Sequence, residues 1–261
     1  YTNARDTLYL NIDRINGQVK GIYTNYAVDL PTGVDPSTYL YENGINCEHV
    51  WPQSLYEGGE PIKSDMHILR PCKDNVNSAR GNKPFNEIND LQTTTWYWQD
   101  NQTSNMPSSD IDEYSENHGV FFEPREDRKG DIARTMFYFY TMYEDVADQD
   151  FFQDQKEVLR TWHDQDPTDS DAIFRTWQIA GYQENKPNPF LLDHTLIDRA
   201  YFYEGIILGD MNEDGDLNIL DVVALVIMIV ENGTTNSNAD INSDGEYNVL
   251  DVVFLINIIL G

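Results

Sequence analysis

At residues 46–54 the sequence reads Asn46-Cys47-Glu48-His49-Val50-Trp51-Pro52-Gln53-Ser54, which sets a carboxylate beside an imidazole and then a proline. A carboxylate binds hard cations such as Mg²⁺, and a neutral imidazole accepts a proton near neutral pH. These are two parts of a metal-assisted hydrolysis of a phosphodiester. Because side chains alternate along a strand, Glu48 and His49 can serve one site only at a strand end or kink, and Pro52 fits such a break.

Further polar segments follow this pair along the chain. They are residues 64–71, 75–85, 129–134 and 183–194. In the first, Asp65 and His67 lie two residues apart and would share one face of a regular strand. In the second, Asn77 and Arg80 lie three residues apart on an expected helix. The pair at 48–49 therefore has candidate partners downstream.

In this order and spacing the segments resemble the endonuclease I family of secreted or periplasmic bacterial nucleases, over about residues 1–200. The resemblance implies a ββα-metal active site related to that of HNH nucleases. Such a site would cleave DNA, with RNA as a second candidate substrate, and would leave 5′-phosphate ends. Carried over by position, it makes His49 the general base and Glu48 and Asn77 the protein ligands of one catalytic Mg²⁺. It makes His67 a residue that supports the site from behind, without binding the metal.

The basic residue that would stabilise the phosphate is open. The family resemblance implies an arginine between the first two segments, but residues 55–64 contain only Lys63. Arg80 and Arg134 are the other candidates. Arg80 would either contact the phosphate or form an ion pair at the start of its helix.

The overall charge argues against binding of nucleic acid. With 45 acidic and 17 basic residues, the formal net charge is −28, and such a chain repels phosphates at long range. Adaptation to salty surroundings, bound Ca²⁺, or an acidic or cationic partner would each account for the acidity. Nine of the basic residues nevertheless bracket the motifs and predict a local basic cleft and salt-tolerant activity. They are Lys63, Arg70, Lys73, Arg80, Lys83, Arg125, Arg128, Lys129 and Arg134.

The last part of the chain contains an internal repeat of 30 residues. Residues 210–230 and 240–260 are identical at 11 of 21 positions, and each copy opens with oxygen-bearing side chains and continues into an apolar run. The first copy offers Asp210, Asn212, Asp214, Asp216, Asn218 and Asp221, and the second Asp240, Asn242, Asp244, Glu246, Asn248 and Asp251. With glycine at position 6, this spacing is typical of a loop that wraps Ca²⁺. We therefore predict two structural Ca²⁺ ions.

Two such loops, each followed by a helix, resemble the dockerin module over residues 209–261. The resemblance implies a cohesin-like partner that contacts loop positions 10 and 11, which are often polar. Here those positions are Ile219-Leu220 and Val249-Leu250, which are apolar. That the module packs on its own catalytic domain, or simply caps the C-terminus, is therefore an equal alternative.

The predicted fold is α+β. It has a mainly helical nuclease domain with a ββα-metal motif at 1–205 and a small, duplicated, all-α module at 209–261. Helices are expected from Asp131 as N-cap, over 151–162 and over 171–181, and residues 104–117 are expected to form a loop. No apolar run reaches the ~18 residues that cross a bilayer.

The family resemblance implies a secreted bacterial protein. The chain starts at Tyr1 without Met, as after either trimming or removal of a leader. Cys47 and Cys72 flank the first two segments. They would form a disulfide in an oxidising compartment or remain two small buried thiols.

A function of a different class is a non-catalytic, Ca²⁺-dependent scaffold or adhesion protein. It accounts for the acidic repeat but leaves the spacing of the polar segments as coincidence. Under the nuclease hypothesis, the acidic surroundings should keep His49 protonated to higher pH, so that activity favours neutral to alkaline conditions.

Overall fold

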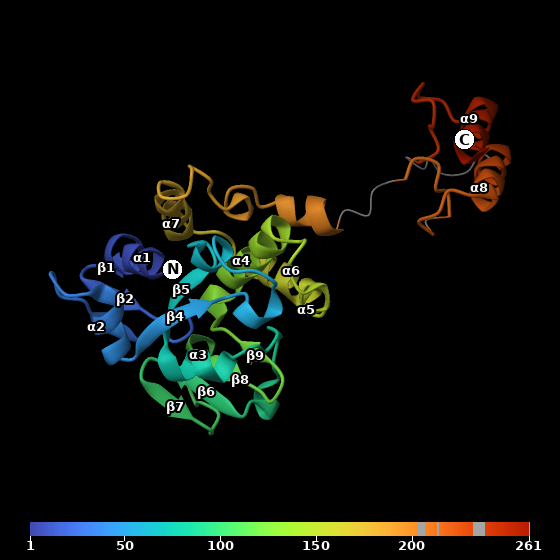
Figure 1. The fold of residues 1–261 in the computed structure, drawn as a ribbon. Coiled ribbons are helices and arrows are strands. Elements are labelled where there is room, and N and C mark those ends of the chain that lie inside the picture. Colours follow the sequence, from blue (N-terminus) through green and yellow to red (C-terminus); the bar gives the residue numbers. More distant parts are fainter. Residues whose placement is uncertain (203–206, 213, 232–237, 261) are drawn as a thin grey trace. The chain divides into compact units, whose positions relative to one another are not determined.

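The computed structural model describes residues 1–202, 207–212, 214–231 and 238–260. The predicted end of the catalytic segment at 205 and the final residue of the module, 261, lie outside these ranges. The chain divides into two compact units, residues 1–201 and residues 202–261 (Figure 1). Each unit is described by itself.

The first unit contains three antiparallel sheets. The site is built on the smallest, in which β4 (Ile45–His49) pairs with β5 (Leu69–Lys73) in the register Ile45↔Lys73 to His49↔Leu69. Helix α3 (Asp74–Arg80) begins directly after β5. The remaining strands are β1 (Arg14–Ile15), β2 (Gln18–Lys20) and β3 (Ala27–Asp29) in one sheet, and β7 (Asn101–Thr103), β6 (Thr95–Trp98), β8 (Ser115–Asn117) and β9 (Phe122–Glu123) in the other.

Helix α4 (Lys129–Met142) is the core of the first unit, and 12 of its 14 residues are buried. It packs along α6 (Lys156–Gln165), and Phe139 stacks on Trp51 with 4.5 Å between the ring centroids. This stacking holds the segment after β4 against the core. The other helices are α1 (Thr2–Thr7), α2 (Pro36–Glu42), α5 (Gln149–Gln153) and α7 (Ser170–Ala180), and a π-helical segment, η1, covers Leu8–Ile12.

The mixture of helices and strands confirms the α+β class, but three local predictions were wrong. Asp131 is not an N-cap: α4 begins two residues earlier, because Asp131 is buried between Arg128 and Arg134, with which it forms ion pairs. The helix expected over 151–162 is interrupted at residues 154–155. The expected loop at 104–117 ends in β8, whose polar strand is paired on both sides by β6 and β9.

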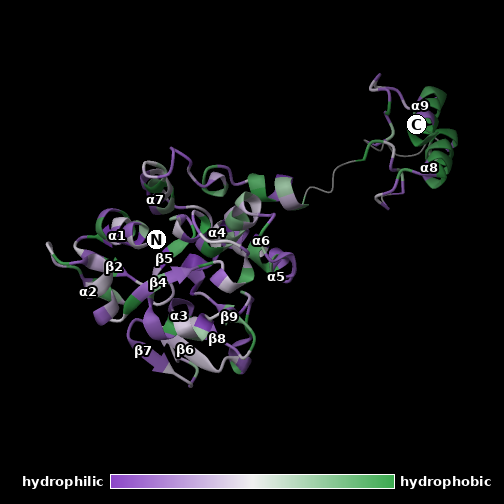
Figure 2. Ribbon diagram, viewed as in Figure 1, coloured by the Kyte–Doolittle hydropathy of each residue, from purple (hydrophilic) through white to green (hydrophobic). Residues whose placement is uncertain are grey.

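The second unit contains α8 (Ile219–Val230) and α9 (Val249–Leu260), each preceded by one of the two acidic loops. Both helices are strongly hydrophobic (Figure 2), and they pack on each other. The core consists of Val222, Leu225, Ala239, Ile241, Val252 and Leu255. In the described part of the chain, every helix is too short or too polar to span a membrane.

Candidate active site

Glu48 and His49 are the last two residues of β4. Glu48 is 3% exposed, and its Oε1 accepts a hydrogen bond of 2.8 Å from the Tyr23 hydroxyl and lies 3.6 Å from Arg80 Nε. No hydrogen bond from the described residues reaches Oε2. Burial raises the pKa of Glu48, and Arg80 and Tyr23 oppose that rise. A buried carboxylate with one oxygen anchored and the other unbonded suits a cation ligand.

The His49 ring is held at both of its nitrogens. Its Nε2 lies 3.0 Å from the carbonyl oxygen of Lys63, and its Nδ1 lies 3.0 Å from Gln53 Nε2. A carbonyl can only accept, so we assign the proton to Nε2, which leaves the Nδ1 lone pair to accept from the Gln53 amide. The structure therefore orients a neutral imidazole with Nδ1 as its basic atom.

Burial lowers the pKa of His49 to about 4 and outweighs the hydrogen bond to the Lys63 carbonyl, which raises it. The expectation that the acidic chain would keep His49 protonated to higher pH was therefore wrong. Local desolvation of the ring exceeds the effect of distant, solvent-screened carboxylates. His49 is neutral at weakly acidic as well as neutral pH.

This shift predicts a pH dependence that NMR can measure. The His49 ring signal of the folded protein should titrate near pH 4, against the usual 6.5 for histidine. As the pH falls, His49 of the unfolded chain takes up a proton before His49 of the folded chain does. The free energy of unfolding should therefore be independent of His49 above pH 6.5 and decrease as the pH falls from 6.5 toward 4. A midpoint at or above 6.5 would contradict this account.

Asn77 lies on α3 beside the end of β4. Its Nδ2 donates to Asn46 Oδ1 at 2.7 Å and to the carbonyl oxygen of Cys47 at 3.3 Å. Both donor hydrogens are therefore directed at β4, and no hydrogen bond among the described residues reaches Oδ1. The arrangement anchors the Asn77 amide next to Glu48 and leaves its oxygen as a possible metal ligand.

Of the two roles expected for Arg80, the structure shows the ion pair. Arg80 is the last residue of α3, is 1% exposed and donates to the Val50 carbonyl oxygen at 2.7 Å in addition to its ion pair with Glu48. Its guanidinium stabilises the site from behind and is not open to a phosphate. The ion-pair alternative is confirmed, although at the end of the helix.

Several of the residues predicted to form a basic cleft are buried. Arg125, Lys129 and Arg134 are at most 4% exposed, and each forms ion pairs with acidic residues. Of the three candidates for a phosphate contact, only Lys63 lies beside His49 without being buried. The sequence alone does not show which basic side chains lie at the surface and which are buried in ion pairs with acids.

His67 is 4% exposed and bonds through Nε2 to the carbonyl oxygen of Lys186 at 2.9 Å. The argument that Asp65 and His67 share a strand face was wrong, because β5 begins only at Leu69. Asp65 instead accepts from the His67 backbone N–H and from the hydroxyls of Tyr138 and Tyr143. This network fastens the loop before β5 to α4 and to residues 183–186.

Sequence reasoning missed four residues next to the pair. Tyr23 holds Glu48, and Gln53 holds His49. Tyr1 packs against the His49 ring, with 5.2 Å between the ring centroids and a tilt of 31°, and the Arg5 guanidinium lies 4.8 Å from the centre of the Tyr1 ring. Gln53 was inside the decisive motif and could have been considered. No local pattern connects Tyr1, Arg5 or Tyr23 with β4.

Cys47 and Cys72 are free thiols. Their strands are neighbours, but Cys47 pairs with Pro71 and Cys72 pairs with Asn46. An offset of one residue directs the two side chains to opposite faces of the hairpin, which excludes a bridge in this arrangement.

The two acidic loops of the second unit have the same internal geometry. Asp210 accepts from the backbone N–H of Asp214 and Gly215, and Asp240 accepts from those of Asp244 and Gly245. Asp221 and Asp251 are fully buried and reach back to the loop starts, where each accepts three backbone N–H groups. Gly215 and Gly245 both have φ of +85°, as the sharp turn requires.

Two other groups of described residues bring three potential metal ligands together. One consists of Glu87, Glu123 and Glu126 and surrounds the Lys129 ammonium, which forms ion pairs with all three carboxylates. The other consists of His163, Asp164 and His194, in which His163 already bonds to the His194 carbonyl oxygen. Neither group includes Glu48, His49 or Asn77.

A family model described as Endonuclease I matches residues 1–195, and one described as Dockerin type I domain matches residues 208–260. The chain is 35% identical over 165 residues to an extracellular ribonuclease of Bacillus amyloliquefaciens, covering 57% of this chain and 50% of that protein. It is 32% identical over 164 residues to an extracellular ribonuclease of Bacillus subtilis strain 168, with coverages of 57% and 51%. The chain thus spans about half the length of these relatives.

Proposed function

The chain belongs to the endonuclease I family over residues 1–195, and on that premise we propose that it is a secreted bacterial endonuclease that hydrolyses phosphodiesters with one Mg²⁺ ion. The observation that carries the proposal is the end of β4, where Glu48, His49 and the Asn77 amide are each held by named partners. The catalytic domain would comprise residues 1–205, with β4, β5 and α3 as its ββα-metal motif.

The donor set fits a hard cation. Glu48 Oε2 and Asn77 Oδ1 accept no hydrogen bond from the described residues, and they would hold the ion, with water and phosphate at its remaining positions. When bound, the metal would stabilise negative charge on the phosphorane and on the leaving 3′ oxygen. Tyr23 and Arg80 would keep the Glu48 carboxylate oriented and ionised.

His49 would act as the general base through Nδ1. The Lys63 carbonyl oxygen accepts from Nε2–H and would stabilise the imidazolium that forms when Nδ1 takes a proton from water. Gln53 now donates to Nδ1, so its amide must rotate away for the water to approach. Attack in line would leave a 5′-phosphate and a 3′-hydroxyl.

The substrate would include RNA as well as DNA. The two curated relatives are called extracellular ribonucleases, which supports RNA as a substrate and an extracellular location. Family membership supports an endonuclease.

We also propose that residues 209–261 bind two Ca²⁺ ions through the six side chains of each loop and dock onto a cohesin-like partner. Loop positions 10 and 11 are more than half exposed in both copies: Ile219 65%, Leu220 59%, Val249 67% and Leu250 52%. The apolar character of these positions suits a partner with an apolar surface. Docking onto residues 1–205 of the same chain remains the alternative.

A cleavage assay tests the proposed function. We expect the full chain to nick plasmid and to digest RNA with Mg²⁺, to lose both activities in EDTA, and to regain them with Mg²⁺ but not with Ca²⁺ alone. Glu48→Gln should lower activity more than tenfold and require more Mg²⁺, because the amide removes the anionic ligand. No metal-dependent cleavage of either substrate would favour the scaffold alternative.

A further inference from the structure

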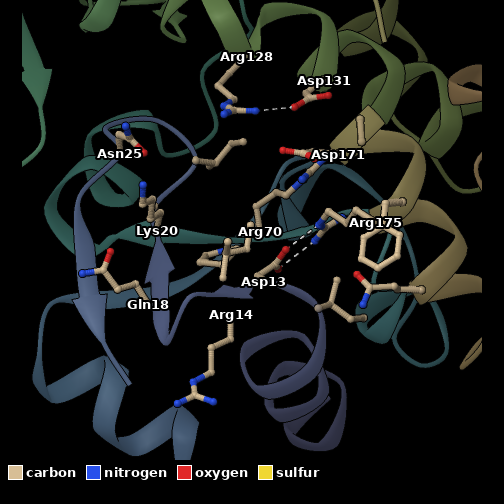
Figure 3. Close-up of a pocket in the computed structure, with 18 of the residues that line it drawn as sticks. Asp13, Arg14, Gln18, Lys20, Asn25, Arg70, Arg128, Asp131, Asp171 and Arg175 are labelled. Carbon is tan, nitrogen blue, oxygen red and sulfur yellow. Dashed lines mark hydrogen bonds and ion pairs between the residues drawn. The ribbon is translucent and has the colours of Figure 1, made fainter. Parts of the chain in front are cut away.

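A pocket of about 740 Å³ lies between β2, β5 and the starts of α4 and α7, and none of Glu48, His49 and Asn77 lines it (Figure 3). Its walls include five basic residues, Arg14, Lys20, Arg70, Arg128 and Arg175, and four acidic ones, Asp13, Asp131, Asp169 and Asp171. Five cations against four anions give this pocket a net positive charge in a chain of net charge −28.

Three of the four acids of the pocket already have protein partners. Asp13 forms an ion pair with Arg175 at 2.7 Å, and Asp131 is shared by Arg128 at 3.2 Å and Arg134 at 3.3 Å. Asp169 caps α7 by accepting from the Ala172 N–H at 2.7 Å. Asp171 is exposed on the first turn of α7. Asp131 and Asp13 also act on the charge of Arg70 through space, but neither forms an ion pair with it.

Arg70 is a further cation of the pocket. It is 9% exposed, and in the described ranges it has neither an ion pair nor a hydrogen bond, with its Nε fully buried. Figure 3 shows it extending from β5 between the Arg128–Asp131 pair and the Asp13–Arg175 pair. Burial, followed by the neighbouring Arg175, lowers the pKa of Arg70 to about 10. A buried guanidinium without a partner destabilises the fold unless a ligand supplies the missing anion.

We propose that this pocket binds a phosphate group of a nucleotide-sized ligand, with Arg70 as its central donor. A guanidinium presents paired donors that match phosphate oxygens, and Arg128, Arg175 and Lys20 add positive charge around it. The volume lies within the range of small-molecule sites. Gln18 and Asn25 on the opposite wall provide polar groups for the rest of the ligand. The proposal does not depend on the nuclease activity.

The test is calorimetric titration of the full Ca²⁺-loaded chain with inorganic phosphate, with adenosine 5′-monophosphate and with a short DNA strand in a His49→Ala background. Chloride at matched ionic strength is the reference. We expect Arg70→Met to weaken phosphate binding at least tenfold, Arg70→Lys to weaken it less, and the exposed control Arg199→Met to leave it unchanged. Tighter binding of the mononucleotide than of the strand would identify a free nucleotide as the ligand, and the reverse would identify a strand end.

Thermal unfolding separates this role from a structural one. Because Arg70 forms no hydrogen bond or ion pair with a described residue, Arg70→Met should unfold at the same or a higher temperature than the wild type without ligand, and phosphate should stabilise only the wild type. The proposal is overturned if the wild type binds neither phosphate nor nucleotide, or if chloride has the same effect. It is also overturned if Arg70→Met binds normally or is clearly less stable.

Discussion

Replacing His49 with alanine is expected to lower the rate of nucleic-acid cleavage by about 10²–10⁴-fold. The imidazole is held through Nε2 by the Lys63 carbonyl oxygen, and its Nδ1 is the basic atom at this end of β4. Glu48 and Asn77 keep their own partners in the variant, so Mg²⁺ affinity should change little. The loss should therefore be in kcat, measured on RNA and plasmid under saturating metal.

Chemical rescue distinguishes a proton acceptor from a packing residue. Imidazole added to His49→Ala should restore part of the activity, because the truncated side chain leaves space beside Gln53. The matched control is His194→Ala, which removes an imidazole that is largely exposed and lies outside the site. A His49→Ala protein with more than a tenth of the wild-type rate would remove His49 as the base.

Removal of Ca²⁺ is expected to unfold the second unit and leave the first intact. The predicted ligand positions of each loop gather four carboxylates, Asp210, Asp214, Asp216 and Asp221 in one and Asp240, Asp244, Glu246 and Asp251 in the other. Their mutual repulsion acts on a core of six buried residues. An ion at 100 times its Kd contributes about 2.7 kcal/mol, which is a large part of the stability of so small a unit. Circular dichroism should lose the signal of α8 and α9 on chelation.

Single substitutions should show which loop supports which helix. Asp221→Ala and Asp251→Ala each remove a buried carboxylate that accepts three backbone N–H groups, so each should lower Ca²⁺ affinity and destabilise its own copy most. Asp198→Ala, an exposed acid outside both loops, is the control. Retention of the full helical signal in excess chelator would contradict the role of calcium.

Sequence patterns were most informative where all the interacting residues of a motif lie close together in the chain. The repeat at 210–221 and 240–251 folds into two loops whose side chains bond to their own backbones, so spacing alone indicated their shape. The family resemblance was likewise carried by short segments and is confirmed by the match to residues 1–195. Strand β8 was missed, because its three residues are polar and only β6 and β9 make them a strand.

The sequence by itself determined the α+β class, the family, the calcium-type loops and the position of Glu48 beside His49 at the end of a strand. Those properties depend on residue order and on contacts within a dozen residues. Only the tertiary structure decided that Arg80 lies under Glu48, that the Lys63 carbonyl selects the His49 tautomer, and that Arg70 is buried without an ion pair to any described residue. Such properties depend on burial and on partners far along the chain, because desolvation and ion pairing act between residues that only folding brings together.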